Sequence, residues 1–165
     1  MTVDAPGART GEEADAAVTT VPGACLAVLT ADCAPVVMAG DERVLAVVHA
    51  GWRGLREGVV EAAAARMREL GATRIQAALG PCIHAECYEF VDVADWFDEE
   101  VRATTRAGTP ALDLPAAVRA SLRRAEVELV HDEAVCTSCA ADDFFSHRAR
   151  GEAERQATVA WITTS

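Results

Sequence analysis

The sequence places a thiol and an imidazole at the ends of two neighbouring apolar runs. Cys33 follows the run from Ala24 to Leu29, and His49 closes the run from Arg43 to His49. Thiolate sulfur and imidazole nitrogen are ligands that zinc prefers in proteins. Cys33 and His49 are therefore candidate metal ligands, although this spacing taken alone is more typical of ordinary core residues.

A catalytic zinc ion normally has three protein ligands and keeps a fourth position for water or substrate. Cys33 and His49 supply two, so a third ligand must come from elsewhere. A second interpretation of the same pair is a nucleophilic Cys33 activated by His49. Zinc removal distinguishes the two, because a thiol nucleophile needs no metal ion.

The elements that must position this pair are short strands separated by turns. Besides the two apolar runs, the pattern predicts strands at 35–38, 74–79, 126–130 and 158–162. Residues Ala39 to Asp41 have the composition of a hairpin turn, which would bring Cys33 and His49 together.

Helices are predicted in three segments. Residues 55–70 have apolar side chains at every fourth position and Gly71 at the end, and Asp113 is a good N-cap for a helix that runs to about Arg124. A third helix is predicted at about 93–104, residues 1–13 as an irregular lead-in, and 106–110 as a hinge. We therefore expect one α/β domain over residues 1–165, with mixed β-sheets flanked by helices in an α+β layered arrangement.

Composition narrows the classes of partner. A chain of 165 residues can bury a core, and no apolar run approaches the roughly 18 residues that a membrane span needs. The first residues lack the basic and apolar parts of a secretory signal, so we expect no membrane partner and a cytoplasmic location. The net charge of −11 argues against nucleic acid as a partner.

Six cysteines are present, and a chain of this length in a reducing compartment favours metal binding, catalysis or burial over disulfides. Cys136 and Cys139 form a C-x-x-C pair, which is either redox-active or half of a four-cysteine zinc site completed by Cys82 and Cys87. The segment from Pro81 to Cys87 also contains pieces of a zinc cytidine-deaminase signature, but in the wrong order and with the wrong spacing.

Six motifs in order closely resemble the YfiH-type laccase-domain family, also called polyphenol oxidase or purine nucleoside phosphorylase. The resemblance extends from about Ala14 to Ile162. The motifs are TADCAPV at 30–36, VHAGWRG at 48–54, GPCI at 80–83, CYE at 87–89, CT at 136–137 and FFSHR at 144–148.

The resemblance implies a zinc enzyme that acts on purine nucleosides and phosphate, with Cys33 and His49 as metal ligands. Its implied reactions are phosphorolysis of adenosine, inosine, guanosine and methylthioadenosine, and deamination of adenosine. The competing activity is copper-dependent oxidation of phenols. The family's third ligand, a His in an upstream Gln-Val-His-Gly motif, has no counterpart here, and neither does an upstream Arg-containing motif.

This departure leads to three expectations. The first is a truncated or mis-started reading frame. The second is a natural short form that borrows a ligand from elsewhere. The only other histidines are His84, His131 and His147, and His147 is not counted as a ligand. The third is an inactive fragment or interaction module. The sequence leaves open whether the protein is a monomer or a homodimer.

Further roles follow from the chemistry of single residues. Asp32 is a candidate general acid or base, or alternatively a carboxylate that orients His49. Arg53 and Arg148 are candidates for binding phosphate or a purine oxygen, with a structural ion pair as the alternative. Cys82 is expected to line the pocket, and Trp52 is expected to be buried against the following helix rather than to stack on a purine.

Overall fold

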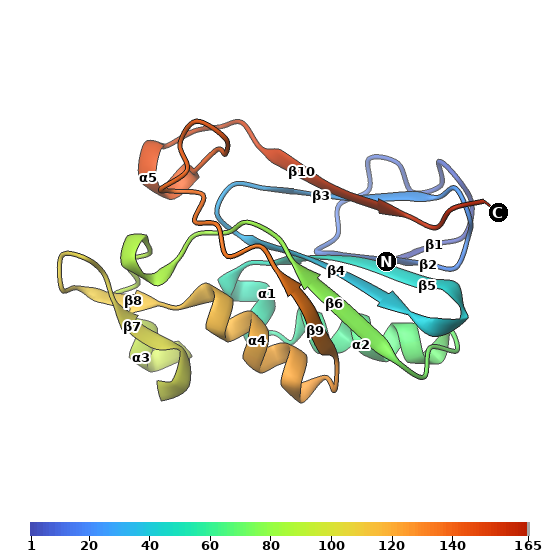
Figure 1. Cartoon of the computed structure of the whole chain (residues 1–165), viewed down its shortest axis with the longest axis horizontal. Coiled ribbons are helices and arrows are strands. Elements are labelled where there is room, and N and C mark those ends of the chain that lie inside the picture. Colours follow the sequence, from blue (N-terminus) through green and yellow to red (C-terminus); the bar gives the residue numbers. More distant parts are fainter. Residues whose placement is uncertain (165) are drawn as a thin grey trace.

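A computed structural model describes residues 1–164, and a mixed six-stranded sheet runs through its centre (Figure 1). The strand order is β1-β2-β5-β4-β6-β9; β1–β2 and β6–β9 pair in parallel, and the other neighbours are antiparallel. Its strands are β1 Thr2–Val3, β2 Ala16–Thr19, β4 Ala34–Gly40, β5 Val44–Ala50, β6 Ile75–Leu79 and β9 Glu128–Asp132.

The two central strands form the hairpin that the sequence predicts. β4 and β5 consist mainly of Val and Ala, and most of their side chains are buried. Strands buried on both faces require such continuous apolar runs. The turn Asp41–Arg43 joins β4 to β5. The residues just before β4 and those at the end of β5 therefore lie side by side, at the end of the hairpin opposite the turn.

Helices cover one face of this sheet (Figure 1). They are α1 Trp52–Arg56, α2 Val59–Glu69 and α4 Leu114–Arg124, and the main core lies between them and the sheet. Asp113 caps α4 as predicted, because its carboxylate accepts a hydrogen bond from the backbone N–H of Ala116 at 2.9 Å.

A two-stranded antiparallel sheet covers the opposite face (Figure 1). It consists of β3 Cys25–Thr30 and β10 Gln156–Trp161. A second, smaller core that includes Leu26, Val28 and Val47 lies between the two sheets. In β3 only alternate side chains are buried, so one face of this strand lies on the core and the other is exposed.

The remaining elements lie beside α4 and above the sheet. They are the hairpin β7 Arg102–Thr104 and β8 Pro110–Leu112, the short helices α3 Val93–Trp96 and α5 His147–Arg150, and the 3-10 turns Ala85–Cys87 and Glu99–Val101. The layered α/β class is as expected.

Several boundaries differ from the expectation. The helix predicted at 55–70 is interrupted at Gly58, whose φ of +81° is left-handed and cannot continue a right-handed helix. The helix predicted at 93–104 is wrong beyond Trp96, because residues 102–104 pair with β8. The segment 106–110, expected to be a hinge, contains the turn between β7 and β8. The segment 1–13, expected to be irregular, contains the short strand β1.

Candidate functional site

The β4–β5 hairpin brings Cys33 and His49 to one point. Pro35 is the register partner of His49, and Cys33 directly precedes β4. A Cβ atom on Gly51 would lie 3.0 Å from Cys33 Sγ and 3.7 Å from His49 Nε2. The missing side chain at Gly51 therefore leaves a space that both ligand atoms border.

Asp15 is a further acidic residue at this site, and the sequence analysis did not single it out. Its carbonyl accepts a hydrogen bond from the His49 backbone N–H at 2.7 Å, and its carboxylate lies 3.9 Å from His49 Nδ1. That separation is too long for a hydrogen bond. Only the antiparallel pairing of β2 with β5 brings Asp15 here, so no local signal could have revealed it.

Asp32 joins three segments around the site. Its backbone φ is +88°, and its buried carboxylate accepts hydrogen bonds from Thr137 Oγ1 at 2.8 Å and from the Arg148 backbone N–H at 2.7 Å. Its carbonyl accepts one from the Ile83 N–H at 2.9 Å. Within residues 1–164 no hydrogen bond joins this carboxylate to His49, so the structure does not show the alternative in which Asp32 orients His49. Asp15 is the carboxylate beside that ring.

The environment of Cys33 keeps its thiol protonated. Burial raises the pKa of Cys33, and the negative charges of Asp32 and Asp15 raise it further. A thiol in such surroundings is a poor nucleophile at neutral pH. The nucleophilic interpretation of Cys33 is therefore the weaker of the two, because a bound cation is what would ionise this thiol.

The guanidinium groups of two exposed arginines, Arg53 and Arg148, lie over aromatic rings. The guanidinium carbon of Arg148 lies 5.1 Å from the ring centre of Tyr88, and that of Arg53 lies 4.7 Å from the ring centre of Trp52. Arg148 is close enough to Cys33 to lower the pKa of its thiol slightly against the larger effects above. Neither guanidinium forms an ion pair with a described residue, so the structural ion-pair alternative is not observed.

Trp52 and Cys82 both face the core. The ring of Trp52 is half-buried and packs edge-on against Phe90, with centroids 5.2 Å apart, so its aromatic partner is Phe90 rather than the helix predicted to follow it. Cys82 is only 2% exposed and belongs to the main core, and burial raises the pKa of its thiol. This differs from the expected place in a pocket lining, because a side chain so buried offers no surface to a substrate.

The described residues fit a zinc ion only in part. Cys33 and His49 provide one sulfur and one nitrogen donor, but within residues 1–164 no third Cys, His, Asp or Glu donor joins them in a group within 4.8 Å. Two other histidines are engaged elsewhere: His131 Nε2 lies 3.0 Å from Glu133, and His147 Nδ1 lies 3.2 Å from the Glu152 carbonyl oxygen.

Three other cysteines do gather, namely Cys87, Cys136 and Cys139, with their sulfur atoms all within 4.8 Å of one another. Three of the four cysteines in the zinc-site alternative therefore lie close together. Cys82 is not in the group, because its side chain points into the core.

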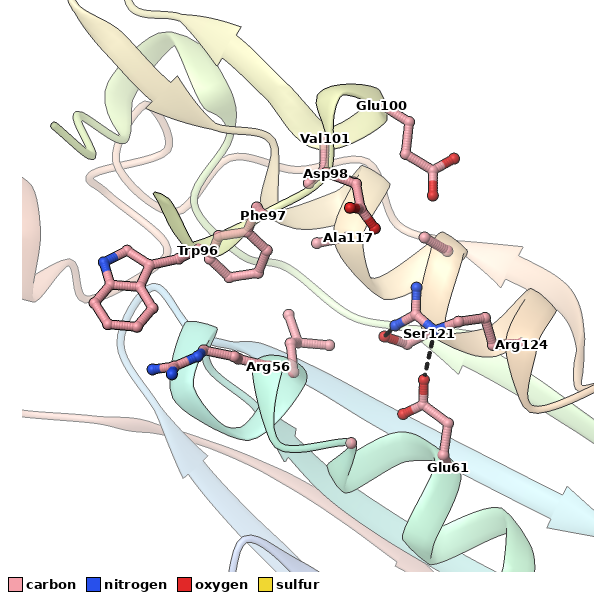
Figure 2. A pocket seen from close by; sticks show the side chains of 13 residues that line it. Arg56, Glu61, Trp96, Phe97, Asp98, Glu100, Val101, Ala117, Ser121 and Arg124 are labelled. Carbon is pink, nitrogen blue, oxygen red and sulfur yellow. Dashed lines mark hydrogen bonds and ion pairs between the residues drawn. The ribbon is translucent and has the colours of Figure 1, made fainter. Parts of the chain in front are cut away.

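A separate pocket of about 340 Å³ lies between α1, α2, α4 and the segment 96–101 (Figure 2). Arg124 forms an ion pair with Glu61 across this pocket, with an N–O distance of 3.0 Å. The guanidinium carbon of Arg56 lies 3.8 Å from the ring centre of Trp96. None of the predicted site residues lines this pocket.

No helix in the described part of the chain has the length and apolar character needed to cross a bilayer.

Comparisons with known proteins agree with the geometry. Residues 1–163 match the sequence family described as multi-copper polyphenol oxidoreductase laccase. A purine nucleoside phosphorylase of Xylella fastidiosa is 43% identical over 90% of this chain and 61% of its own length, and one of Streptomyces coelicolor is 45% identical over 97% and 69%. The chain thus spans about three fifths of the Xylella relative's length.

Solved structures share the fold. Protein NMB0706 of Neisseria meningitidis has a TM-score of 0.83 and 32% identity, covering 98% of this chain and 71% of its own. YfiH of Bacillus licheniformis has a TM-score of 0.81 and 29% identity, covering 90% and 61%. By sequence match, fold and the motifs that meet at Cys33 and His49, the chain belongs to the YfiH-type, multi-copper polyphenol oxidoreductase laccase family.

Proposed function

We propose that this chain forms part of an enzyme that splits purine nucleosides with phosphate. The observation that carries the proposal is the meeting of Cys33 Sγ and His49 Nε2 beside Gly51. Support comes from two relatives that cover at least nine tenths of this chain and are named purine nucleoside phosphorylase.

In the proposed reaction a phosphate oxygen attacks C1′ of the ribose, and the bond between C1′ and the purine nitrogen breaks. The electron pair of that bond passes to the purine, which takes up a proton and leaves as the free base. Arg53 and Arg148 are suited to hold phosphate or a purine oxygen, because exposed guanidinium groups offer paired donors to an oxyanion.

We assign Asp32 a positioning role in this reaction. Both of its carboxylate oxygens accept hydrogen bonds, and one of these bonds fixes the backbone of Arg148. Movement of a proton by Asp32 stays a prediction. The Asp15 carboxylate faces Nδ1 of His49, the ring nitrogen other than the one that lies beside Cys33.

Zinc is the proposed metal, with copper as the alternative. When bound, zinc supplies a Lewis acid, and Cys33 and His49 would hold it. Because these two residues fill only part of a zinc coordination sphere, the proposal requires one further donor from outside the described residues. The proposed substrates are adenosine, inosine, guanosine and methylthioadenosine, with adenosine deamination as a further reaction.

The family description favours phenol oxidation as a second candidate function. Blue-copper centres typically combine two histidines with a cysteine, and laccase chemistry needs such copper sites. Within residues 1–164 no group of three metal-binding side chains contains a histidine. The zinc site at Cys33 and His49 is incomplete in the same way, so support for nucleoside chemistry comes from the relatives named purine nucleoside phosphorylase.

The test is phosphate-dependent release of hypoxanthine from inosine by the purified chain with Zn²⁺, with and without added imidazole. Imidazole offers the nitrogen donor that the described residues lack. We expect turnover with zinc and imidazole, and a loss of at least about 100-fold in Cys33→Ala and in His49→Ala, since each removes a metal ligand.

Cys25→Ala is the matched control, because Cys25 is an exposed cysteine on β3 outside the site. Base release that needs no phosphate, or that survives Cys33→Ala, contradicts the proposal. Oxidation of a phenol in parallel reactions loaded with Cu²⁺ would support the second candidate instead.

A further inference from the structure

A group of three thiols lies apart from Cys33 and His49. Cys87 Sγ and Cys139 Sγ are 3.5 Å apart, and Cys136 Sγ lies within 4.8 Å of both. A tetrahedral zinc ion with Zn–S bonds of about 2.3 Å separates its sulfur ligands by about 3.8 Å. The three sulfurs therefore have nearly the spacing of ligands around one ion.

We propose that Cys87, Cys136 and Cys139 form a second metal site, a three-thiolate centre for Zn²⁺. We name this group the cysteine cluster. It shares no residue with the Cys33 and His49 site, so its occupancy does not depend on the proposed function.

Backbone hydrogen bonds hold the ligands of the cysteine cluster in place. The N–H groups of Cys139 and Ala140 both donate to the Cys136 carbonyl, at 3.0 and 2.9 Å, which makes the C-x-x-C segment a tight turn. Cys87 ends the 3-10 turn Ala85–Cys87, and its N–H donates to the His84 carbonyl at 3.0 Å. C-x-x-C turns are a common zinc-binding unit, so the site needs little rearrangement to bind.

Neighbouring donors match the charge of a thiolate centre. Arg106 Nη2 donates to Cys139 Sγ at 3.2 Å, and the His84 backbone N–H donates to Cys136 Sγ at 3.4 Å. Three thiolates around Zn²⁺ have a net charge of −1, which the Arg106 guanidinium balances. Hydrogen bonds of this kind orient metal ligands and raise metal affinity.

The fourth coordination position is open to solvent. Cys139 is exposed, whereas Cys87 and Cys136 are half-buried. Water or a small ligand can therefore complete a tetrahedral centre. A disulfide between Cys87 and Cys139 would use two sulfurs and leave Cys136 without a role, which is why a metal ion explains the convergence of all three better.

A metal ion here would tie two loops to the candidate active site. Tyr88 follows Cys87 and lies under the Arg148 guanidinium, while Thr137 follows Cys136 and donates to Asp32. Two of the three ligands, Cys87 and Cys136, are thus one residue from a side chain that contacts Arg148 or Asp32. The role that follows is structural: the ion holds the segments 80–89 and 133–140 together.

The test uses a Cys33→Ala/His49→Ala variant, in which the first site cannot contribute metal. We expect about one zinc per chain after dialysis against a weak chelator. Titration with Co²⁺ should produce a sulfur-to-cobalt charge-transfer band with the intensity of three thiolates. Adding Cys139→Ser or Cys87→Ser should weaken binding by more than about 100-fold, since loss of outer contacts alone costs 10–100-fold.

The matched control is Cys25→Ser in the same background, because Cys25 is exposed and far from the cluster in sequence. It should retain the metal. Circular dichroism checks that each serine variant remains folded. The proposal is overturned if the background variant holds no zinc or if zinc persists in both serine variants. It is also overturned if metal-free protein purified with reductant contains a Cys87–Cys139 disulfide, which mass spectrometry detects as the loss of two hydrogens.

Discussion

Asp32 illustrates how one residue can organise several loops. Its left-handed backbone conformation is tolerated by Asp more readily than by most residues, because the short polar side chain can form local hydrogen bonds. The carboxylate is buried, and it is satisfied by Thr137 and by the Arg148 backbone. A buried charge requires such partners, since an unsatisfied one is costly.

Thr137→Val tests this arrangement at the scale of a residue. Thr137 is fully buried, and valine matches its shape but cannot donate to Asp32. We expect the free energy of unfolding to fall by about 1.5–3 kcal/mol, the range for hydrogen bonds to charged groups. Urea denaturation measures it. Thr20→Val, at an exposed position, is the control, and equal stability of the two variants would contradict the expectation.

At the scale of elements, a glycine decides how the chain turns after the site. α1 ends at Arg56, and Gly58 adopts a φ of +81° before α2 begins at Val59. This break separates α1, which contacts β5 and α4, from α2, which packs its apolar face on β5.

Gly58→Ala should lower the free energy of unfolding by about 1–2 kcal/mol, the cost of a left-handed conformation for an L-residue. A Cβ there would meet only Glu61 Oε2 at 3.7 Å, so the cost is conformational rather than steric. Gly58→Asn should recover part of the loss, because Asn tolerates this region. Thermal unfolding measures both, and an alanine variant as stable as the parent protein would refute the explanation.

Asp41 links the β4–β5 turn to the start of β6, and its role depends on pH. Hydrogen bonds from the Thr73 hydroxyl and from the backbone N–H groups of Arg74 and Thr73 lower the pKa of Asp41 below its ordinary value of 3.8. A lowered folded-state pKa stabilises the protein above the unfolded-state pKa, and this contribution disappears as pH falls through the folded-state value.

Asp41→Asn should therefore be less stable than the parent protein at neutral pH. The difference in melting temperature should begin to shrink near pH 3.8 and should vanish once the pH is below the lowered folded-state pKa. Glu42→Gln, which changes an exposed neighbour without these hydrogen bonds, should show no such trend. A difference that stays constant with pH would mean that the charge of Asp41 is not involved.

At the scale of the whole molecule, the two cores differ in how they are covered. Helices close the main core, whereas the second core lies between the main sheet and the β3–β10 sheet. The outer face of that sheet is apolar, with Leu29 60%, Val159 48% and Trp161 55% exposed. Contiguous apolar surface of this kind marks contact sites or promotes association.

The double variant Leu29→Thr/Val159→Thr should reduce concentration-dependent self-association of the purified chain. Threonine keeps the preference for strands but adds a hydroxyl. Stability should change by no more than about 0.5 kcal/mol per site, because both positions are exposed. Light scattering over a concentration series measures association, with Val130→Thr on β9 as the control. Unchanged scattering in the double variant would show that this face does not drive association.

Much of this protein was determined by local sequence. The apolar runs before Cys33 and His49 and the cap at Asp113 each depend on nearby residues, and each is present in the structure. The turn predicted at 39–41 lies slightly later, at Asp41–Arg43, because Ala39 and Gly40 still pair with β5. Motif order likewise identified the family, which the comparisons confirm. These features are readable because turns, caps and periodicity act over a few residues.

Tertiary structure alone decided the rest. Asp15 reaches His49 through the β2–β5 pairing, residues 102–104 become a strand through pairing with β8, and Cys87 meets Cys136 and Cys139 across two loops. Each depends on contacts between segments distant in sequence. Such pairing outweighs the weak local preference of a short segment, so it is determined only when the whole chain packs.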